Sequence, residues 1–198
     1  MKRVGLLGGT FDPPTLAHVD AAVRAREELG LDEVWLVPAR PVHKSDVTSG
    51  WHRLEMCRIA VRDALGVEVS SVELDRAGVS RSYETLEALT AAWRDVEFTF
   101  LIGDDVDVLS WWRGQECLEK WNFVRLARPG GRVIQDEIPR IVREGCGASS
   151  TTARADLSKT GHSDVLDTAV EEYIQTNGLY QSNKVLLDFG TEMRELVQ

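Results

Sequence analysis

Short apolar runs alternate along the chain with longer segments of helical periodicity, and this pattern predicts alternating strands and helices. The first run, Val4-Gly5-Leu6-Leu7, ends in glycines and predicts a buried strand. From Leu16 to Leu29 the apolar side chains recur at helical spacing, and Gly30 is a suitable C-terminal stop for that helix. The run from Glu33 to Pro38 predicts the second strand.

The rest of the chain continues this alternation. We expect further helices from Arg53 to Leu65, from Ser82 to Trp93, from Ser150 to Leu157 and from Val165 to Thr176. We expect further strands from Val96 to Ile102 and from Asn122 to Leu126, a bent strand or strand pair from Val67 to Leu74, and a last strand beginning within Arg132 to Ile134. Such alternation favours a doubly wound, Rossmann-like parallel sheet of the α/β class, covered on both faces, with a small C-terminal helical portion.

The expected organisation is one domain over residues 1–181, whose final helical portion covers about 149–181, and a C-terminal tail at 182–198. In sheets of this kind, ligands bind beyond the carboxyl ends of the strands. The segments to inspect for a site are therefore Gly8 to His18, Ala39 to Lys44 and Gly103 to Asp105.

The composition is that of an ordinary soluble protein. Of 198 residues, 43% are hydrophobic and 28% are charged, and no apolar run is long enough for a transmembrane helix. The first residues lack the cleavage pattern of a signal peptide, so we expect a cytoplasmic protein without a membrane partner. Three cysteines without a Cys-x-x-Cys pair argue against a disulfide scaffold, and four histidines without ligand spacing argue against a protein-held metal.

The charge pattern narrows the class of ligand. The net charge is -9 and no block of lysine or arginine stands out, which disfavours nucleic-acid binding because that binding depends on neutralising many phosphates. A small phosphorylated substrate remains compatible, since a few local cations and backbone amides suffice to hold it. The sequence leaves self-association into a homo-oligomer open.

The segment from Gly8 to His18 predicts a phosphate site. Two glycines after a buried strand let the backbone turn tightly, and free N–H groups in such a turn form a concavity for an anion. Thr15 and His18 are three residues apart, so they share one face of the first helical turn, at the positive end of the helix dipole. A hydroxyl and an imidazole would therefore face the bound phosphate.

This segment resembles the Gly-Gly-Thr-Phe-Asp-Pro-x-His-x-Gly-His signature of the nucleotidylyltransferase superfamily, in its nicotinate-nucleotide adenylyltransferase branch. Thr15 stands where this branch usually has its first histidine, and Ala17 replaces the glycine before His18. Related nucleotidylyltransferases use threonine at the first of these positions. The resemblance implies catalytic roles for His18 and Thr15, and phosphate binding by Gly8, Gly9, Thr10 and Phe11.

Two further segments carry the resemblance on the phosphate side. Residues 38–44 resemble the family's Pro-x-x-x-Pro-Pro-His-Lys loop, which implies that Lys44 lies near a phosphate, although the residue alone would suit an exposed loop. Residues 149–154 resemble the second signature, Ser-Ser-Thr-x-x-Arg. There the resemblance implies that Ser150 and Thr151 bind phosphate and that Arg154 neutralises charge on the β- and γ-phosphates.

The remaining matches concern the nucleotide. Residues 76–86 resemble a family segment that binds the pyridine ring, with Arg81 in the tyrosine position and Ser82 in the threonine position. Arg81 would pair with a nicotinate carboxylate or reach solvent, and Ser82 would also suit a helix N-cap. Asp105 matches the acid of Ile-Ile-Gly-x-Asp, implying a bond to the nucleotide or to Mg²⁺, or else an N-cap. Trp111 would stack on the pyridine ring.

The resemblance spans roughly residues 1–181 and implies adenylyl transfer from ATP to nicotinate mononucleotide, giving nicotinate adenine dinucleotide and pyrophosphate, with Mg²⁺ accompanying ATP. Its closing Asn-Gly-Leu-Tyr, ending at Tyr180, is interpreted as structural. Nicotinamide mononucleotide and phosphopantetheine are alternative substrates of the same chemistry. The departures at Thr15, Ala17 and Arg81 keep open a nucleotide-binding regulator that has lost catalysis.

Overall fold

A single parallel sheet forms the centre of the molecule. The computed structural model describes residues 1–40, 47–127, 133–142 and 148–181. The six strands are β1 (Lys2–Gly9), β2 (Glu33–Pro38), β3 (Val67–Val69), β4 (Val96–Gly103), β5 (Asn122–Ala127) and β6 (Arg140–Val142), all paired in parallel in the order β3-β2-β1-β4-β5-β6. The strand order reverses direction between β1 and β4, which is where ligands of doubly wound sheets bind. The predicted sheet class is confirmed.

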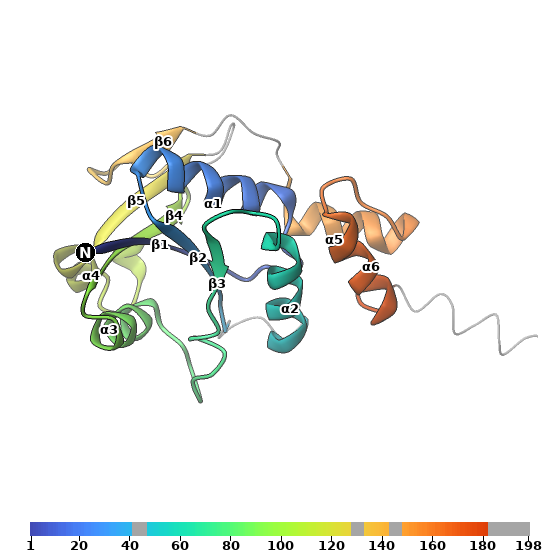
Figure 1. The fold of residues 1–198 in the computed structure, drawn as a ribbon, viewed down its shortest axis with the longest axis horizontal. Coiled ribbons are helices and arrows are strands. Elements are labelled where there is room, and N and C mark those ends of the chain that lie inside the picture. The colour runs from blue at the N-terminus through green and yellow to red at the C-terminus, as the bar shows by residue number, and fades with distance from the viewer. Residues whose placement is uncertain (41–46, 128–132, 143–147, 182–198) are drawn as a thin grey trace, which may run out of the picture.

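Helices cover both faces of this sheet (Figure 1). The helical segments are α1 (Leu16–Leu29), α2 (Gly50–Val61), α3 (Ser82–Ala92), the 3-10 turn η1 (Val108–Ser110), α4 (Gly114–Lys120), α5 (Ser150–Thr160) and α6 (Thr168–Thr176). The predicted bounds of α1 are confirmed at both ends, and Gly30 caps it in the left-handed conformation, with φ of 60°. Glycine adopts that conformation without the steric cost that a Cβ would bring.

The two faces of the sheet carry two separate apolar cores because successive side chains of a strand point to opposite sides. On β4, Leu101 packs with Ala21 of α1 in one core. Its neighbour Phe100 packs with Leu86 of α3 in the other. Strands buried on both faces in this way read as nearly continuous apolar runs, which is the pattern of the sequence.

The last two helices, α5 and α6, pack against α2 and lie to one side of the sheet in Figure 1. Met56 of α2 is fully buried among Leu157 of α5 and Val170 and Ile174 of α6. The next residue, Cys57, faces the sheet core instead. Helix α2 therefore buries two faces, which explains why its sequence shows no simple apolar stripe.

Two predicted strands differ from the structure. The strand expected from Val67 to Leu74 ends at Val69, because Ser71 accepts backbone hydrogen bonds from Leu74 and Asp75 and starts a turn. The last strand is β6, from Arg140 to Val142, and not at the expected 132–134; of that range, residue 132 lies outside the described residues. Both real strands have three residues, and pairing with a neighbouring strand, more than local pattern, defines them.

Candidate active site

The carboxyl ends of β1, β2 and β4 enclose a cavity of about 320 Å³. Five of the residues predicted to bind phosphate or pyridine line it, namely Gly8, Gly9, Thr10, Ser82 and Trp111. Segments that are far apart in the sequence thus meet at the switch point of the sheet, as the topology requires.

Phe11 gives the turn after β1 an unusual conformation. Its φ is 49°, in the left-handed region that bulky residues rarely adopt, at a cost of about 1–3 kcal/mol. Its ring is 2% exposed and lies against Gly9, where an added Cβ would come within 2.9 Å of Phe11 Cζ. The ring also meets the imidazole of His18 edge-on, at 5.1 Å between centroids. Phe11 therefore connects the end of β1 to His18. The tight turn predicted at the two glycines is not formed there, because Gly8 and Gly9 are strand residues of β1 paired with Val37 and Pro38, and the chain leaves the sheet after them.

The hydrogen bonds of His18 fix the tautomer of its neutral ring. The backbone N–H of Thr15 donates to His18 Nδ1 at 3.0 Å, and Thr15 Oγ1 lies 2.8 Å from the same nitrogen. Because a backbone N–H can only donate, Nδ1 must accept and the ring proton is on Nε2. Nε2 is then a hydrogen-bond donor. Thr15 itself is 1% exposed, so its hydroxyl orients the His18 ring from the buried side of the site.

The start of α5 lies against residues 12–13, which lie between β1 and α1. Ser150 Oγ donates to the carbonyl of Pro13 at 2.8 Å, and Arg154 Nη1 donates to the carbonyl of Asp12 at 2.6 Å. Thr151 faces Arg154, whose Nη2 is 3.4 Å from the Thr151 hydroxyl. The structure therefore brings the two signature segments, 142 residues apart at this bond, into direct contact.

Asp12 is a buried carboxylate, 4% exposed, at the back of this segment. It accepts hydrogen bonds from the Tyr180 hydroxyl and from the backbone N–H of Thr48. Burial raises the pKa of Tyr180, and the bond to Asp12 acts in the same direction, so the phenol stays protonated and donates. The last described residues thus support the first signature.

The two aspartates after β4 have different environments. Asp104 is 3% exposed and its carboxylate pairs with Arg140 at 2.7 Å, so its role is structural. Asp105 is exposed at the strand end, and the N-cap of the following turn is Asp107 instead. Arg125, fully buried, donates to the carbonyls of Gly103 and Val106 and so fixes the loop that carries Asp105.

The predicted pyridine-binding residues separate into two groups. Ser82 and Trp111 line the cavity, and the Trp111 ring packs edge-on against Phe100. Arg81 is not among the cavity-lining residues: its guanidinium stacks over Trp112 at 4.6 Å. Arg81 is also the N-cap of α3, so the N-cap assignment for Ser82 was wrong by one residue. Lys44 lies outside the described residues.

Comparison with known proteins agrees with this arrangement. The profile of the family described as Cytidylyltransferase-like matches residues 6–156. A probable nicotinate-nucleotide adenylyltransferase of Bacillus mycoides is 37% identical over 193 residues, covering 92% of this chain and 100% of the relative. The nicotinate-nucleotide adenylyltransferase of Bacillus subtilis is 33% identical with the same two coverages. The chain belongs to the nicotinate-nucleotide adenylyltransferase family.

As a member of that family, the chain is a nucleotidyltransferase with the fold expected of one. The solved Plasmodium falciparum nicotinic acid mononucleotide adenylyltransferase, complexed with NaAD, superposes with a TM-score of 0.78 at 22% identity. The superposition covers 91% of this chain and 98% of the Plasmodium chain. At this identity the likeness concerns the fold alone.

Three residues of the site were not among the predicted site residues, although Ser80 belongs to the segment 76–86 that resembles the family's pyridine-binding segment. Glu73 and Ser80 line the cavity, and Glu73 accepts hydrogen bonds from the Arg40 backbone and the Thr85 hydroxyl. Arg53, 2% exposed, donates to the carbonyls of three segments. A charged residue on a predicted helix ordinarily indicates a solvated face, so the pattern gave no signal for Arg53.

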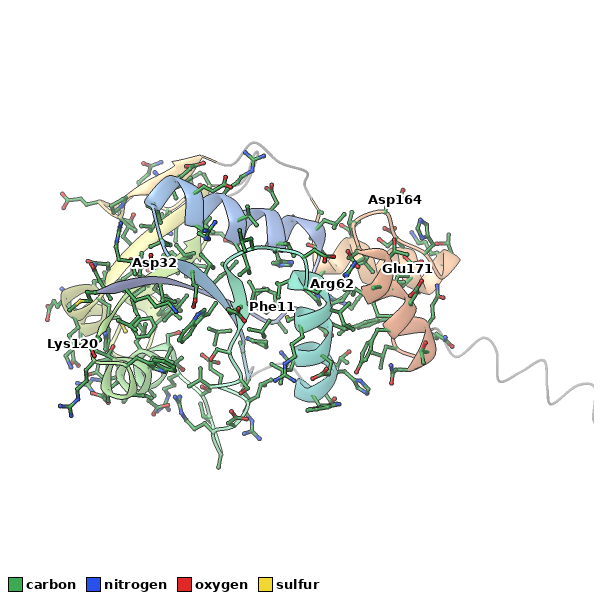
Figure 2. The ribbon with its side chains drawn as sticks, viewed as in Figure 1. Phe11, Asp32, Arg62, Lys120, Asp164 and Glu171 are labelled. Atoms are coloured by element: carbon green, nitrogen blue, oxygen red, sulfur yellow. The ribbon has the colours of Figure 1, made fainter. Side chains whose placement is uncertain are left out.

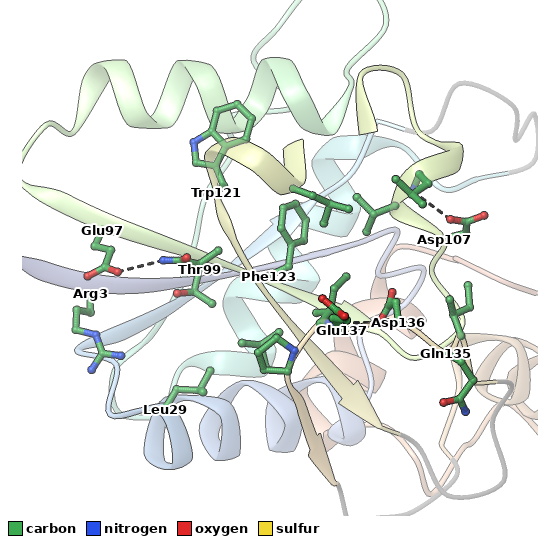
Figure 3. A pocket seen from close by; sticks show the side chains of 18 residues that line it. Arg3, Leu29, Glu97, Thr99, Asp107, Trp121, Phe123, Gln135, Asp136 and Glu137 are labelled. Atoms are coloured by element: carbon green, nitrogen blue, oxygen red, sulfur yellow. Dashed lines mark hydrogen bonds between the residues drawn. The ribbon is translucent and has the colours of Figure 1, made fainter. Parts of the chain in front are cut away.

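A larger cavity, of about 840 Å³, lies beside β5 and away from the adenylyltransferase signatures (Figure 3). Its lining includes Arg3, Glu97, Trp121, Phe123 and Gln135, and none of the predicted site residues. The smaller cavity is the candidate site because Gly8, Gly9 and Thr10 of the first signature line it together with Ser82 and Trp111. His18 and the residues of the second signature are not among its lining residues, and the two signatures meet where α5 contacts Asp12 and Pro13. Within residues 1–40, 47–127, 133–142 and 148–181, no group of side chains could hold a metal ion, and no helix could cross a membrane.

Proposed function

We propose that this protein transfers the adenylyl group of ATP to nicotinate mononucleotide, releasing pyrophosphate and forming nicotinate adenine dinucleotide for NAD biosynthesis. The contact of Ser150 and Arg154 with residues 12–13, between β1 and His18, carries this proposal. The relatives, which are nicotinate-nucleotide adenylyltransferases or probable ones, support the choice of substrate, and the composition supports a cytoplasmic location.

The proposed reaction is an in-line displacement at the α-phosphorus of ATP. A phosphate oxygen of the mononucleotide forms the new bond to phosphorus as the bond to the bridging oxygen of pyrophosphate breaks. The nucleophile is already an anion, so the site needs positioning and charge stabilisation more than a strong base. His18 supplies a hydrogen bond from Nε2 to the α-phosphate, because Nδ1 is committed to Thr15.

The leaving pyrophosphate is proposed to lie between the end of β1 and the start of α5. Gly8 and Gly9, which end the paired strand β1, are proposed to let the phosphates approach closely, and Thr10 and Phe11 to contact them through the backbone, while the amino-terminal end of α1 adds its positive dipole. Ser150, Thr151 and Arg154 approach from α5, and Lys44 is proposed to add a charge. Thr15 acts through His18, since it is buried and bonded to the imidazole.

Mg²⁺ is proposed to arrive with ATP. The exposed carboxylate of Asp105, without a cluster of acidic ligands around it among the described residues, fits an ion that is bound mostly by phosphate oxygens and water. Asp105 would contribute one contact to the ion or to the nucleotide. The ion supplies neutralisation of the charge that develops on the phosphates.

The mononucleotide is proposed to place its pyridine ring against Trp111, beside Ser82. Arg81 stacks on Trp112, and a side-chain rotation would be needed before it could pair with a nicotinate carboxylate. The carboxylate therefore depends first on groups that line the cavity, such as the hydroxyls of Ser80 and Ser82.

The test is pyrophosphate release by the purified protein with ATP and Mg²⁺, in parallel reactions containing nicotinate mononucleotide, nicotinamide mononucleotide or phosphopantetheine. We expect release with nicotinate mononucleotide and much less with the other two. Preference for nicotinamide mononucleotide would instead identify the protein as a nicotinamide-mononucleotide adenylyltransferase. Binding of ATP without release in any reaction would contradict the proposal and favour a regulator that has lost catalysis.

A further inference from the structure

Arg53 is a buried cation in the first turn of α2. Only 2% of the residue is exposed, and burial lowers the pKa of its guanidinium from the usual value, although the negative charge of Asp12 opposes that effect. Charged side chains are rarely buried to this extent unless their hydrogen-bonding groups are satisfied. The partners of the guanidinium therefore indicate why it is there.

Those partners are backbone carbonyls from three separate segments. Nη1 donates to Thr10 at 2.7 Å, after β1, and to Ala39 at 2.8 Å, after β2. Nε donates to Thr48 at 2.9 Å, just before α2. Thr10 and Ala39 both line the candidate cavity. One side chain thus fastens two walls of the site to each other and to α2.

The bond to Thr10 also determines where the next amide points. In a planar trans peptide the C=O and N–H groups point in opposite directions. With the Thr10 carbonyl held against Arg53, the N–H of Phe11 is directed away from the guanidinium. Phe11, with its left-handed φ of 49°, directly follows this anchored peptide, and one residue further along Arg154 donates to the carbonyl of Asp12. Figure 2 labels Phe11 between the sheet and α2.

We propose that Arg53 is a positioning residue of the triphosphate site, which holds the turn after β1 in its anion-binding form by clamping the carbonyls of Thr10 and Ala39. This inference rests on the proposed function in that the anion is the triphosphate of ATP. Arg53 touches neither substrate, and its buried positive charge adds to the field that the phosphates experience.

The test compares Arg53→Lys and Arg53→Met with the unaltered protein. Lysine keeps the charge but cannot span both carbonyls with the geometry of a guanidinium. We expect kcat/KM for ATP to fall about tenfold in Arg53→Lys and about a hundredfold in Arg53→Met, as for a displaced phosphate site. The KM for the mononucleotide should change by less than about threefold, since its pyridine contacts are elsewhere.

A matched control is Arg62→Met, at the C-terminal end of the same helix. Arg62 is labelled in Figure 2 and pairs with Asp167 at 2.7 Å, and neither residue lines the cavity. This variant should lower stability while leaving the KM for ATP unchanged. A loss of activity in Arg53→Lys that tracks only the folded fraction, with unchanged KM for ATP, would overturn the proposal.

ATP binding, measured by calorimetry without the mononucleotide, separates this inference from the proposed reaction. If the unaltered protein binds ATP but releases no pyrophosphate, the proposed function fails, and weaker binding in Arg53→Lys still supports the positioning role. Equal binding by both folded proteins overturns it. Faster hydrogen exchange at the Phe11 amide in Arg53→Lys is the expected structural signature, and it remains measurable if Arg53→Met does not fold.

Discussion

At the scale of single residues, side chains that hold other groups matter as much as those proposed to touch substrate. Thr15 replaces the histidine that the family usually has, yet its hydroxyl and backbone both bond His18 Nδ1. Buried at 1% exposure, it fixes the tautomer without reaching the cavity. The departure at this position is therefore compatible with catalysis by His18.

Replacing His18 with alanine should lower kcat by about a hundredfold or more, because it removes a donor proposed to act in the transition state. The KM for ATP should change far less than kcat. Steady-state pyrophosphate release, combined with circular dichroism to verify folding, measures both. Near-normal turnover would remove His18 from the mechanism.

The two glycines at the end of β1 should respond differently to alanine. In Gly9→Ala the new Cβ would come within 2.9 Å of the Phe11 ring, whereas in Gly8→Ala it would rest 3.5 Å from Phe100, an ordinary contact. We expect Gly9→Ala to lower the free energy of unfolding by about 1–3 kcal/mol more than Gly8→Ala. Urea denaturation of both variants tests this, and equal losses would contradict the close approach.

At the scale of elements, the connection between α5 and α6 contains a titratable residue, His162, that pairs with two acidic side chains. His162 is hydrogen-bonded to Glu171 through Nδ1 and to Asp164 through Nε2, and Figure 2 labels both acids. The bond to Glu171, followed by that to Asp164, raises the pKa of His162. The charged imidazole therefore holds the start of the connection against α6.

This contribution should depend on pH. Because the folded-state pKa is raised, the stabilisation is complete below the unfolded value of about 6.5 and is lost as pH rises through the folded value. In urea denaturation, the unaltered protein should exceed His162→Gln in stability at pH 6, and the difference should shrink by pH 9. The effect should be small, since the His162 side chain is 63% exposed. A difference independent of pH would exclude the ionic contribution.

At the scale of the whole molecule, the residues that follow α6 contact the segment that leads into α1. The Tyr180 hydroxyl donates to Asp12, 168 residues earlier, and Asp12 is held in turn by the backbone of Thr48. The C-terminal portion therefore does more than cover α2, because Tyr180 also holds the Asp12 side chain of the first signature in place.

Tyr180→Phe should lower the free energy of unfolding by about 1.5–3 kcal/mol, because it leaves a buried carboxylate short of a donor. Tyr173→Phe is the matched control. The Tyr173 hydroxyl lies 2.8 Å from His52 Nδ1 and is less buried than the Tyr180 hydroxyl, so this change should cost about 0.5–1.5 kcal/mol. Denaturant unfolding of the two variants measures both losses of unfolding free energy. A smaller loss in Tyr180→Phe than in Tyr173→Phe would contradict the proposal that Tyr180 stabilises Asp12.

Much of the fold could be predicted because its signals are local. The bounds of α1 and β2, the stop at Gly30 and the alternation of strands with helices all follow from patterns within about 15 residues. The short strands β3 and β6 could not be placed correctly, because three residues carry too little pattern and pairing with β2 and β5 defines them.

The sequence by itself determined the fold class, the family and the two signature segments, since each is written in neighbouring residues. Only the tertiary structure decided that Arg154 bonds the Asp12 carbonyl, that Arg81 stacks on Trp112 outside the cavity lining, and that Arg53 is buried and bonded to the Thr10 carbonyl after β1. The physical reason is that burial and long-range hydrogen bonds depend on which segments meet at the ends of the strands. A charged side chain has the same local pattern whether it faces water or clamps the backbone of a site.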